Sequence, residues 1–168
     1  SLSKSEFERV ASRFANSSKG TTPAQYRNLN YAGGDDPRQT LDLFRPPQAK
    51  PRKLPLVVYI HGGGWMMGSK EQGRPVVDAI LSTGQYAAAS INYRLTQQAT
   101  WPAQIFDCKA AIRYLRANAD RFGIDPERIA VMGKSAGGHL AALLGTTMKT
   151  DQLEGDIGEH HQQSSSVQ

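Results

Sequence analysis

The chain has 168 residues, of which 39% are hydrophobic and 21% charged, a composition that predicts one folded domain rather than a disordered polymer. No stretch approaches the roughly 18 consecutive apolar residues that a membrane-spanning helix needs. The first twenty residues also lack the apolar block of a secretory signal. The sequence therefore predicts no membrane span, and it leaves the cellular compartment open.

The net charge of +5 comes from the front of the chain. Residues 1–53 hold ten basic and five acidic side chains, whereas the remainder is balanced at ten against ten. Basic residues alternate with prolines over 45–55, which is typical of a solvated connector, so no nucleic-acid partner is predicted. The single cysteine, Cys108, excludes an intrachain disulfide and a multi-cysteine metal site. Its place in an apolar helical pattern predicts a buried small side chain, and no metal site is expected.

The first part of the chain predicts a helical extension followed by strands. Residues 1–20 are expected to form the extension, and 21–168 one α/β domain. Short strands are predicted over 26–31 and 40–44, which can pair as a hairpin. The run from Leu54 to Ile60 is nearly all apolar and rich in valine, as expected for a central strand buried on both faces of a parallel sheet.

Helix and strand patterns alternate regularly after this strand. They predict a helix over 75–81, a strand over 86–91, a helix over 102–121, a strand over 128–132 and a helix over 136–148. In the longest helix, Ile105, Cys108, Ile112 and Leu115 recur at spacings of three and four, which places them on one face toward the sheet. This order predicts an α/β fold with a wound, mostly parallel sheet and flanking helices.

Seven of the sixteen glycines lie in two short stretches, each directly after a predicted strand: 62–64 with 68, and 133 with 137–138. In open α/β sheets, ligands bind beyond the carboxyl ends of the strands. Neither stretch contains the G-x-G-x-x-G pattern of a dinucleotide fold or a complete phosphate-binding loop. The glycines therefore indicate close approach of backbone at a site of another kind.

The second glycine stretch contains the pattern G-x-S-x-G, read as Gly133-Lys134-Ser135-Ala136-Gly137 between a strand and a helix. A sharp turn at this point exposes the seryl oxygen, and only small residues two before and two after it avoid a clash with neighbouring backbone. The following helix directs free amides and the positive end of its dipole toward the site, and the amide of Ala136 is one of them.

The first glycine stretch reads His61-Gly62-Gly63-Gly64-Trp65 and supplies the complementary part. Backbone amides in a loop without side chains can approach a carbonyl oxygen closely. The next residues, Trp65, Met66 and Met67, are candidates to line an acyl or alcohol pocket, with packing against the adjoining helix as the alternative.

With these motifs the sequence resembles the α/β-hydrolase family, in particular the esterase and lipase branch with the H-G-G-G loop, and it is most similar to feruloyl- and acetyl-esterase-like members. The resemblance covers roughly residues 40–148. It is supported by the stretches Ile91-Asn92-Tyr93-Arg94-Leu95, Trp101-Pro102-Ala103-Gln104, Phe106-Asp107-Cys108-Lys109-Ala110-Ala111 and Gly123-Ile124-Asp125-Pro126-Glu127-Arg128. It implies Ser135 as nucleophile, an oxyanion hole formed by the amides of Gly63, Gly64 and Ala136, a small-molecule ester as substrate and no cofactor.

A seryl nucleophile needs a histidine base and a carboxylate, which follow it along an α/β-hydrolase chain. His139 lies within the next helix and is expected to have a packing role. His160 and His161 lie in a polar stretch that predicts a surface loop, and the carboxylates at 151, 154, 156 and 159 are expected to be solvated. None of these residues is assigned to the triad.

The hypothesis that follows is the N-terminal portion of a serine carboxylic-ester hydrolase, with about five of eight strands and the next strand beginning at 166–168. Its uncovered apolar sheet edge predicts self-association, or a C-terminal segment that completes the fold. Two alternatives remain open, a peptidase of the same fold and a non-catalytic α/β fragment or binding module.

Overall fold

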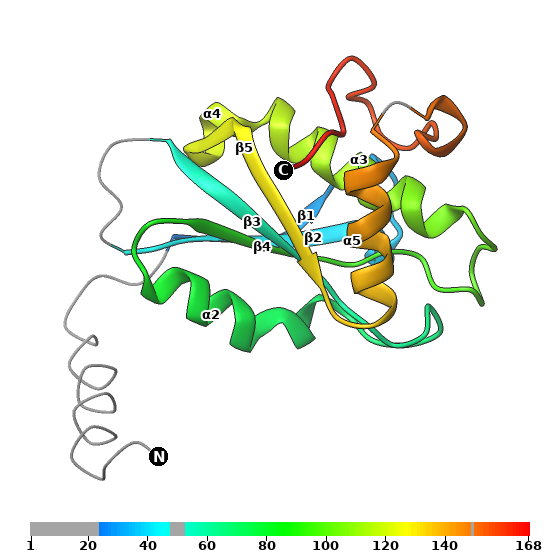
Figure 1. Cartoon of the computed structure of the whole chain (residues 1–168), viewed down its shortest axis with the longest axis horizontal. Coiled ribbons are helices and arrows are strands. Elements are labelled where there is room, and N and C mark those ends of the chain that lie inside the picture. Colours follow the sequence, from blue (N-terminus) through cyan, green and yellow to red (C-terminus); the bar gives the residue numbers. More distant parts are fainter. Residues whose placement is uncertain (1–23, 48–52, 149) are drawn as a thin grey trace, which may run out of the picture.

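The computed structural model describes residues 24–47, 53–148 and 150–168, and the helical extension predicted over 1–20 lies outside them. Five strands form one sheet in the order β1-β2-β4-β3-β5 (Figure 1). Their bounds are Ala24–Asn30 for β1, Thr40–Arg45 for β2, Leu54–Ile60 for β3, Ala87–Ile91 for β4 and Ile124–Gly133 for β5. β3 pairs in parallel with β4 and β5, whereas β2 is antiparallel to β1 and β4. The predicted hairpin, the central position of β3 and the α/β class are confirmed.

Helices cover both faces of the sheet. Their bounds are Arg74–Ser82 for α2, Ala103–Ala117 for α3, Ala119–Phe122 for α4 and Ala136–Thr146 for α5. α2 lies on one face, and α3 and α5 lie on the other (Figure 1). The single helix predicted over 102–121 is wrong in one respect, because it is interrupted at Asn118. The Asn118 side-chain amide donates to the Tyr114 carbonyl at 2.9 Å, which is the local hydrogen bonding by which asparagine competes with helix continuation.

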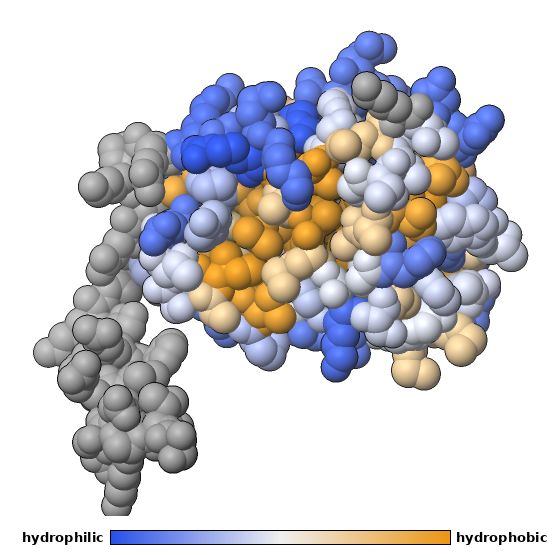
Figure 2. Space-filling view, viewed as in Figure 1, coloured by the Kyte–Doolittle hydropathy of each residue, from blue (hydrophilic) through white to orange (hydrophobic). Residues whose placement is uncertain are grey.

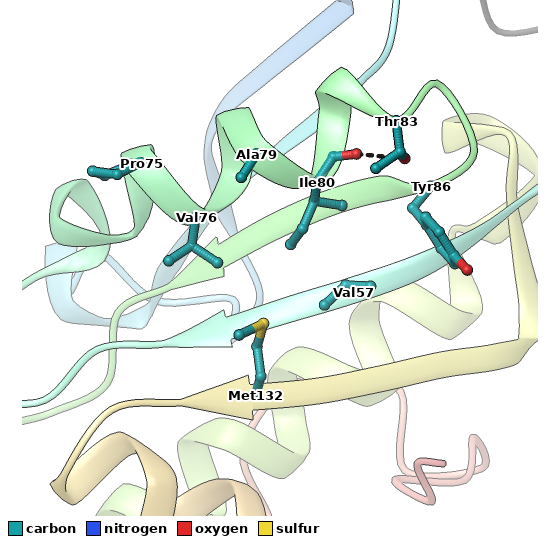
Figure 3. A pocket seen from close by; sticks show the side chains of 8 residues that line it. All are labelled: Val57, Pro75, Val76, Ala79, Ile80, Thr83, Tyr86 and Met132. Atoms are coloured by element: carbon teal, nitrogen blue, oxygen red, sulfur yellow. Dashed lines mark hydrogen bonds between the residues drawn. The ribbon is translucent and has the colours of Figure 1, made fainter. Parts of the chain in front are cut away.

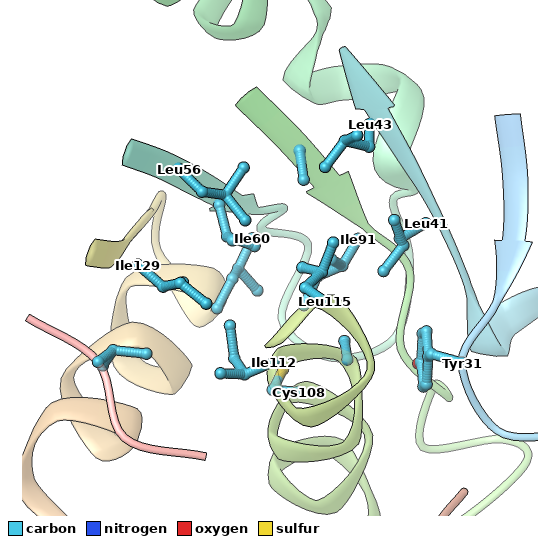
Figure 4. Close-up of a cluster of buried hydrophobic side chains, with 14 of the residues drawn as sticks. Tyr31, Leu41, Leu43, Leu56, Ile60, Ile91, Cys108, Ile112, Leu115 and Ile129 are labelled. Carbon is cyan, nitrogen blue, oxygen red and sulfur yellow. The ribbon is translucent and has the colours of Figure 1, made fainter. Parts of the chain in front are cut away.

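The main core lies between the sheet and α3 (Figure 4). The predicted inward face of α3 is confirmed, since Ile105, Cys108, Ile112 and Leu115 are all fully buried. Burial raises the pKa of the Cys108 thiol well above its ordinary value, and the neighbouring Asp107 carboxylate adds to the effect. The cysteine is therefore a small core side chain and not a thiolate nucleophile.

The segment that follows α5 is held to the body of the protein by Glu154. Its carboxylate accepts hydrogen bonds from Arg113 at 3.1 Å and from the Ser165 hydroxyl. The expectation that Glu154 is solvated is therefore wrong, because Arg113 is almost fully buried and needs a carboxylate partner. At the end of the segment Val167 is buried, and the Gln168 amide donates to the Ile129 carbonyl of β5 at 3.0 Å. The last residues therefore lie along β5, where the next strand was expected to begin.

A buried ion pair fixes the chain just after the first glycine stretch. Lys70 and Asp42 are each about 5% exposed, and Nζ of the lysine lies 2.8 Å from the carboxylate. Asp42 also accepts from the Asn28 amide at 2.8 Å. Burial alone would raise the pKa of Asp42, but the hydrogen bonds from Lys70 and Asn28 outweigh it, so that the pKa lies below its ordinary value.

We expect Asp42→Asn to destabilise the chain by about 2 kcal/mol at pH 7, because Lys70 then loses its buried carboxylate partner and keeps only the exposed carboxylate of Glu71, at 3.2 Å. A carboxyl group whose pKa is lowered in the folded protein stabilises it fully at pH values above the unfolded pKa, which is about 3.9. This stabilisation is lost as the pH falls through the folded pKa. The difference in the free energy of unfolding between the wild type and Asp42→Asn should therefore become smaller in acid. Urea unfolding at pH 7 and below pH 4 measures both effects. Asp78→Asn, which alters an exposed pair with Arg74, should change stability by less than about 0.5 kcal/mol. If the free energies of unfolding of the wild type and Asp42→Asn differed by the same amount at every pH, the ionised Asp42 carboxylate would not be the source of the stabilisation.

Candidate active site

The two glycine stretches lie side by side at the carboxyl ends of neighbouring strands. In the parallel pairing of β3 with β5, Ile60 is the partner of Gly133. The loop after β3 and the turn after β5 therefore begin at the same level of the sheet, as expected from the sequence. The amide of Lys134 also donates to the Ile60 carbonyl, at 3.4 Å.

The turn after β5 has the backbone of a strained nucleophile turn. Ser135 has φ 54° and ψ −120°, in the left-handed range that residues with side chains rarely adopt, and it immediately precedes α5. A Cβ at Gly133 would lie 2.3 Å from the Gly137 carbonyl oxygen, and one at Gly137 would lie 2.1 Å from the Ile60 carbonyl oxygen. The expected reason for glycine at these positions is therefore confirmed. The Ser135 side chain is exposed.

The loop after β3 packs directly against this turn. A Cβ at Gly62 would lie 2.7 Å from the Lys134 carbonyl oxygen and 3.4 Å from the Ser135 Cβ. Gly63 has φ +120°, and its carbonyl accepts hydrogen bonds at 3.1 Å from the amides of Met66 and Met67. The loop is thus a tight turn, closed by hydrogen bonds from two of its own amides to the Gly63 carbonyl.

The amides assigned to the oxyanion hole are available for a ligand. Within the part of the chain that the structure describes, the backbone N–H groups of Gly63 and Gly64 donate to no acceptor. Ala136 is the first residue of α5, where a helix has no internal acceptor for its N–H. Gly64 borders open space, since no atom lies within 4 Å of the position of a Cβ.

His61 fixes the start of the glycine loop. It is completely buried, and its imidazole stacks on the Tyr93 ring with centroids 4.3 Å apart. Nδ1 lies 2.7 Å from the Gly62 carbonyl oxygen and therefore carries the proton, while the Tyr93 hydroxyl donates to the His61 carbonyl at 3.0 Å. Burial lowers the pKa of His61, so the ring is neutral and serves to position the loop.

The residues predicted to line a pocket divide into two groups. Met66 and Met67 are 55% and 64% exposed. Trp65 is half-buried, and its ring meets His139 edge to face at a centroid distance of 5.5 Å. The His139 ring also lies 6.2 Å from the ring of Trp101, which is half exposed. His139 is an exposed residue, but its ring contacts Trp65 as expected for a packing role. The pocket role of Trp65 and Met66 remains a prediction.

The structure does not bring a base or an acid to Ser135. Over residues 24–47, 53–148 and 150–168, no side chain forms a hydrogen bond with the Ser135 hydroxyl. His160 instead lies against the Tyr114 ring at 5.8 Å, His161 is exposed, and Glu154 bonds Arg113. This agrees with leaving all of them unassigned to a triad.

Sequence reasoning missed the roles of Tyr93, Trp101 and Lys70. Tyr93 and Trp101 lie in stretches that carry the family resemblance, but the pattern of one chain does not show that they meet His61 and His139. A lysine among polar neighbours gives no sign of burial. Only the packing of η3, Lys70–Gly73, against the sheet places it beside Asp42.

A parallel-centred sheet, a strained serine turn after β5 and a neighbouring loop of free amides define the α/β-hydrolase class. The model of one family of that class, BD-FAE, matches residues 41–168. The chain belongs to the BD-FAE family.

Named relatives of the chain are esterases. It is 41% identical over 127 residues to Esterase LipC of Mycobacterium tuberculosis, a match that covers 75% of this chain and 31% of that protein. It is 40% identical over 132 residues to Carboxylesterase NlhH of the same organism, covering 79% and 39%. A solved truncated form of carbohydrate esterase from gut microbiota is 34% identical with a TM-score of 0.78, covering 89% of this chain and 57% of that one. The chain thus spans about a third of the length of these curated relatives.

Proposed function

We propose that this chain carries the nucleophile and the oxyanion hole of a serine carboxylic-ester hydrolase. The observation that supports the proposal best is the exposed Ser135 in its left-handed turn, beside free amides of the glycine loop. The named esterase relatives support the same reaction class. The substrate class is a small-molecule carboxylic ester.

The chemistry follows from the geometry of these groups. Ser135 Oγ forms a bond to the ester carbonyl carbon, and the carbonyl π electrons move to oxygen. The amides of Gly63, Gly64 and Ala136 then hold this oxyanion, in place of water that would have to reorganise. When the tetrahedral intermediate collapses, the bond to the alkoxy oxygen breaks and the alcohol leaves with a proton. A water oxygen then forms a bond to the acyl carbonyl carbon, and collapse of this second tetrahedral intermediate breaks the bond to Ser135 Oγ, returns a proton to it and releases the carboxylic acid.

The serine proton must pass to a base, and the described residues supply none at Ser135. All four histidines lie in the described residues, and none of their rings bonds the Ser135 hydroxyl. We therefore propose that a further segment of polypeptide supplies the histidine and the carboxylate, because an unassisted seryl hydroxyl is a poor nucleophile at neutral pH. Steady-state hydrolysis of p-nitrophenyl acetate by the polypeptide that carries this further segment tests the proposal directly. Turnover well above the buffer rate supports the esterase, and ester binding without turnover favours the non-catalytic module. Cleavage of a peptide amide at a comparable rate would favour the peptidase.

We also propose that a second copy of this chain covers an apolar groove beside α2. The groove has a volume of about 570 Å³ and lies between α2 and strands β3 and β5 (Figure 3). Val76 and Ile80 of α2 point into it, toward Val57 and Met132 of the sheet. Figure 2 shows apolar surface gathered over this part of the molecule. Contiguous apolar surface of this kind marks an interaction site.

Met132→Glu is expected to make the chain monomeric, because it places a charge in the floor of the groove. Met148→Glu is the matched control, since both methionines are 42% exposed and Met148 lies outside the groove. Sedimentation velocity at increasing concentration measures the association of all three proteins. A wild-type chain that stays monomeric would contradict the second copy and favour a further segment of polypeptide as the cover.

In the described residues no helix is long and apolar enough to cross a bilayer.

A further inference from the structure

The nucleophile turn and the glycine loop belong to different parts of the chain, and an oxyanion hole needs both in fixed relation. Ala136 supplies its amide from α5, whereas Gly63 and Gly64 supply theirs from the loop after β3. A Cβ at Gly62 would lie 2.7 Å from the Lys134 carbonyl oxygen, so the loop and the turn are close together, but glycine itself offers no side chain to link them. A side-chain contact between the turn and the glycine loop would therefore help to hold them in a fixed relation.

His139 makes such a contact. It lies one turn along α5 from the nucleophile, and its amide donates to the Ser135 carbonyl at 3.0 Å. Its ring meets the indole of Trp65 edge to face, with an interplanar angle of 83° and a centroid distance of 5.5 Å. This is a favoured geometry for an aromatic pair. His139 thus joins the helix of the nucleophile to the residue that directly follows Gly64.

Trp65 is a residue whose position needs support. It has φ 62°, a left-handed backbone that is unfavourable for a bulky side chain. Its indole N–H is buried and finds no acceptor among the described residues. Its backbone carbonyl accepts from the Thr96 amide at 2.9 Å, which fixes the backbone but not the ring. The ring packs against the core on its buried part and contacts His139, and these contacts favour the ring position over others.

We infer that His139 is a positioning residue that acts through Trp65 to hold Gly63 and Gly64 in register with Ser135. Trp101 is a second aromatic neighbour of the imidazole, with ring centroids 6.2 Å apart at 54°. Aromatic shape performs this role, so an imidazole is not required for it. The catalytic meaning of the inference rests on the proposed function, whereas the structural coupling does not.

Hydrogen exchange of the Met66 and Met67 amides, followed by NMR, tests the coupling directly, because both amides close the turn on the Gly63 carbonyl. In His139→Ala we expect these two amides to exchange about fivefold faster, with the core amides of β3 and β4 unchanged. His139→Phe should restore exchange to within about twofold of the wild type, and His139→Leu should not. His161→Ala, which removes an exposed histidine elsewhere, is the control and should exchange like the wild type.

Unchanged exchange in His139→Ala would overturn the inference, and so would a phenylalanine variant no better than the leucine variant. If the alanine variant unfolds as a whole, the comparison of phenylalanine with leucine still decides. Where p-nitrophenyl acetate is hydrolysed, kcat of His139→Ala should fall about tenfold with KM within about twofold, and His139→Phe should recover most of the loss. Absence of turnover in the wild type, with the exchange pattern as expected, would refute the proposed function and leave the coupling intact.

Discussion

Ser135→Ala is expected to abolish covalent labelling by a fluorophosphonate and to lower ester hydrolysis by at least about 10⁴-fold. The substitution removes the only atom that attacks the carbonyl and leaves the neighbouring amides in place. A residual rate above water should remain, because an oxyanion hole without its nucleophile still stabilises charge on the carbonyl oxygen. Folding should be unaffected, since the exposed hydroxyl makes no hydrogen bond within the described residues.

Intact mass before and after the fluorophosphonate is the direct measurement for this prediction. The wild type should gain one adduct on Ser135, and the same mass spectrum shows whether further polypeptide accompanies the 168 residues. Ser82→Ala is the matched control, because Ser82 is an exposed serine on α2 that bonds only the Ala79 carbonyl. An unlabelled wild type of the given mass would mean that the serine has no base, and the non-catalytic alternative would then be correct.

The central elements and the two motifs could be predicted because each depends on residues close together in the chain. The apolar run of β3 and the spacing along α3 are local patterns, and both are as expected. The serine turn follows from local stereochemistry, since only glycine fits at 133 and 137. Parallel pairing then brings two loops, each recognisable alone, to the same edge of the sheet.

The remaining features depend on contacts between distant residues, which a single sequence does not contain. Glu154 looks like a solvated carboxylate until the chain returns to α3, where Arg113 requires a partner. The contact between His139 and Trp65 joins residues that are far apart in the sequence, one in helix α5 and the other in the loop after β3. The interruption of α3 at Asn118 is an exception, because it comes with a local hydrogen bond to Tyr114 that the apolar spacing of the helix does not indicate.

Gly137→Ala is expected to destabilise the chain by about 3 kcal/mol, the largest loss of stability we foresee for a single added carbon. The new Cβ would lie 2.1 Å from the Ile60 carbonyl oxygen and 2.5 Å from the His61 carbonyl oxygen, so backbone rather than a flexible side chain must move. The moved backbone leads directly into the glycine loop. Ester hydrolysis should therefore fall even at temperatures where the variant stays folded.

Gly145→Ala, the same substitution on the same helix, gives the opposite expectation. Nothing lies within 4 Å of its Cβ position, and it is an exposed residue within α5. Alanine should therefore stabilise the helix by about 0.5–1 kcal/mol, by removing the backbone freedom of glycine in the unfolded chain. Urea unfolding of both variants separates the two causes. If both substitutions stabilised the chain, helix propensity alone would account for the effect of Gly137→Ala. The close approach of α5 to β3 would then not be the reason for glycine at position 137.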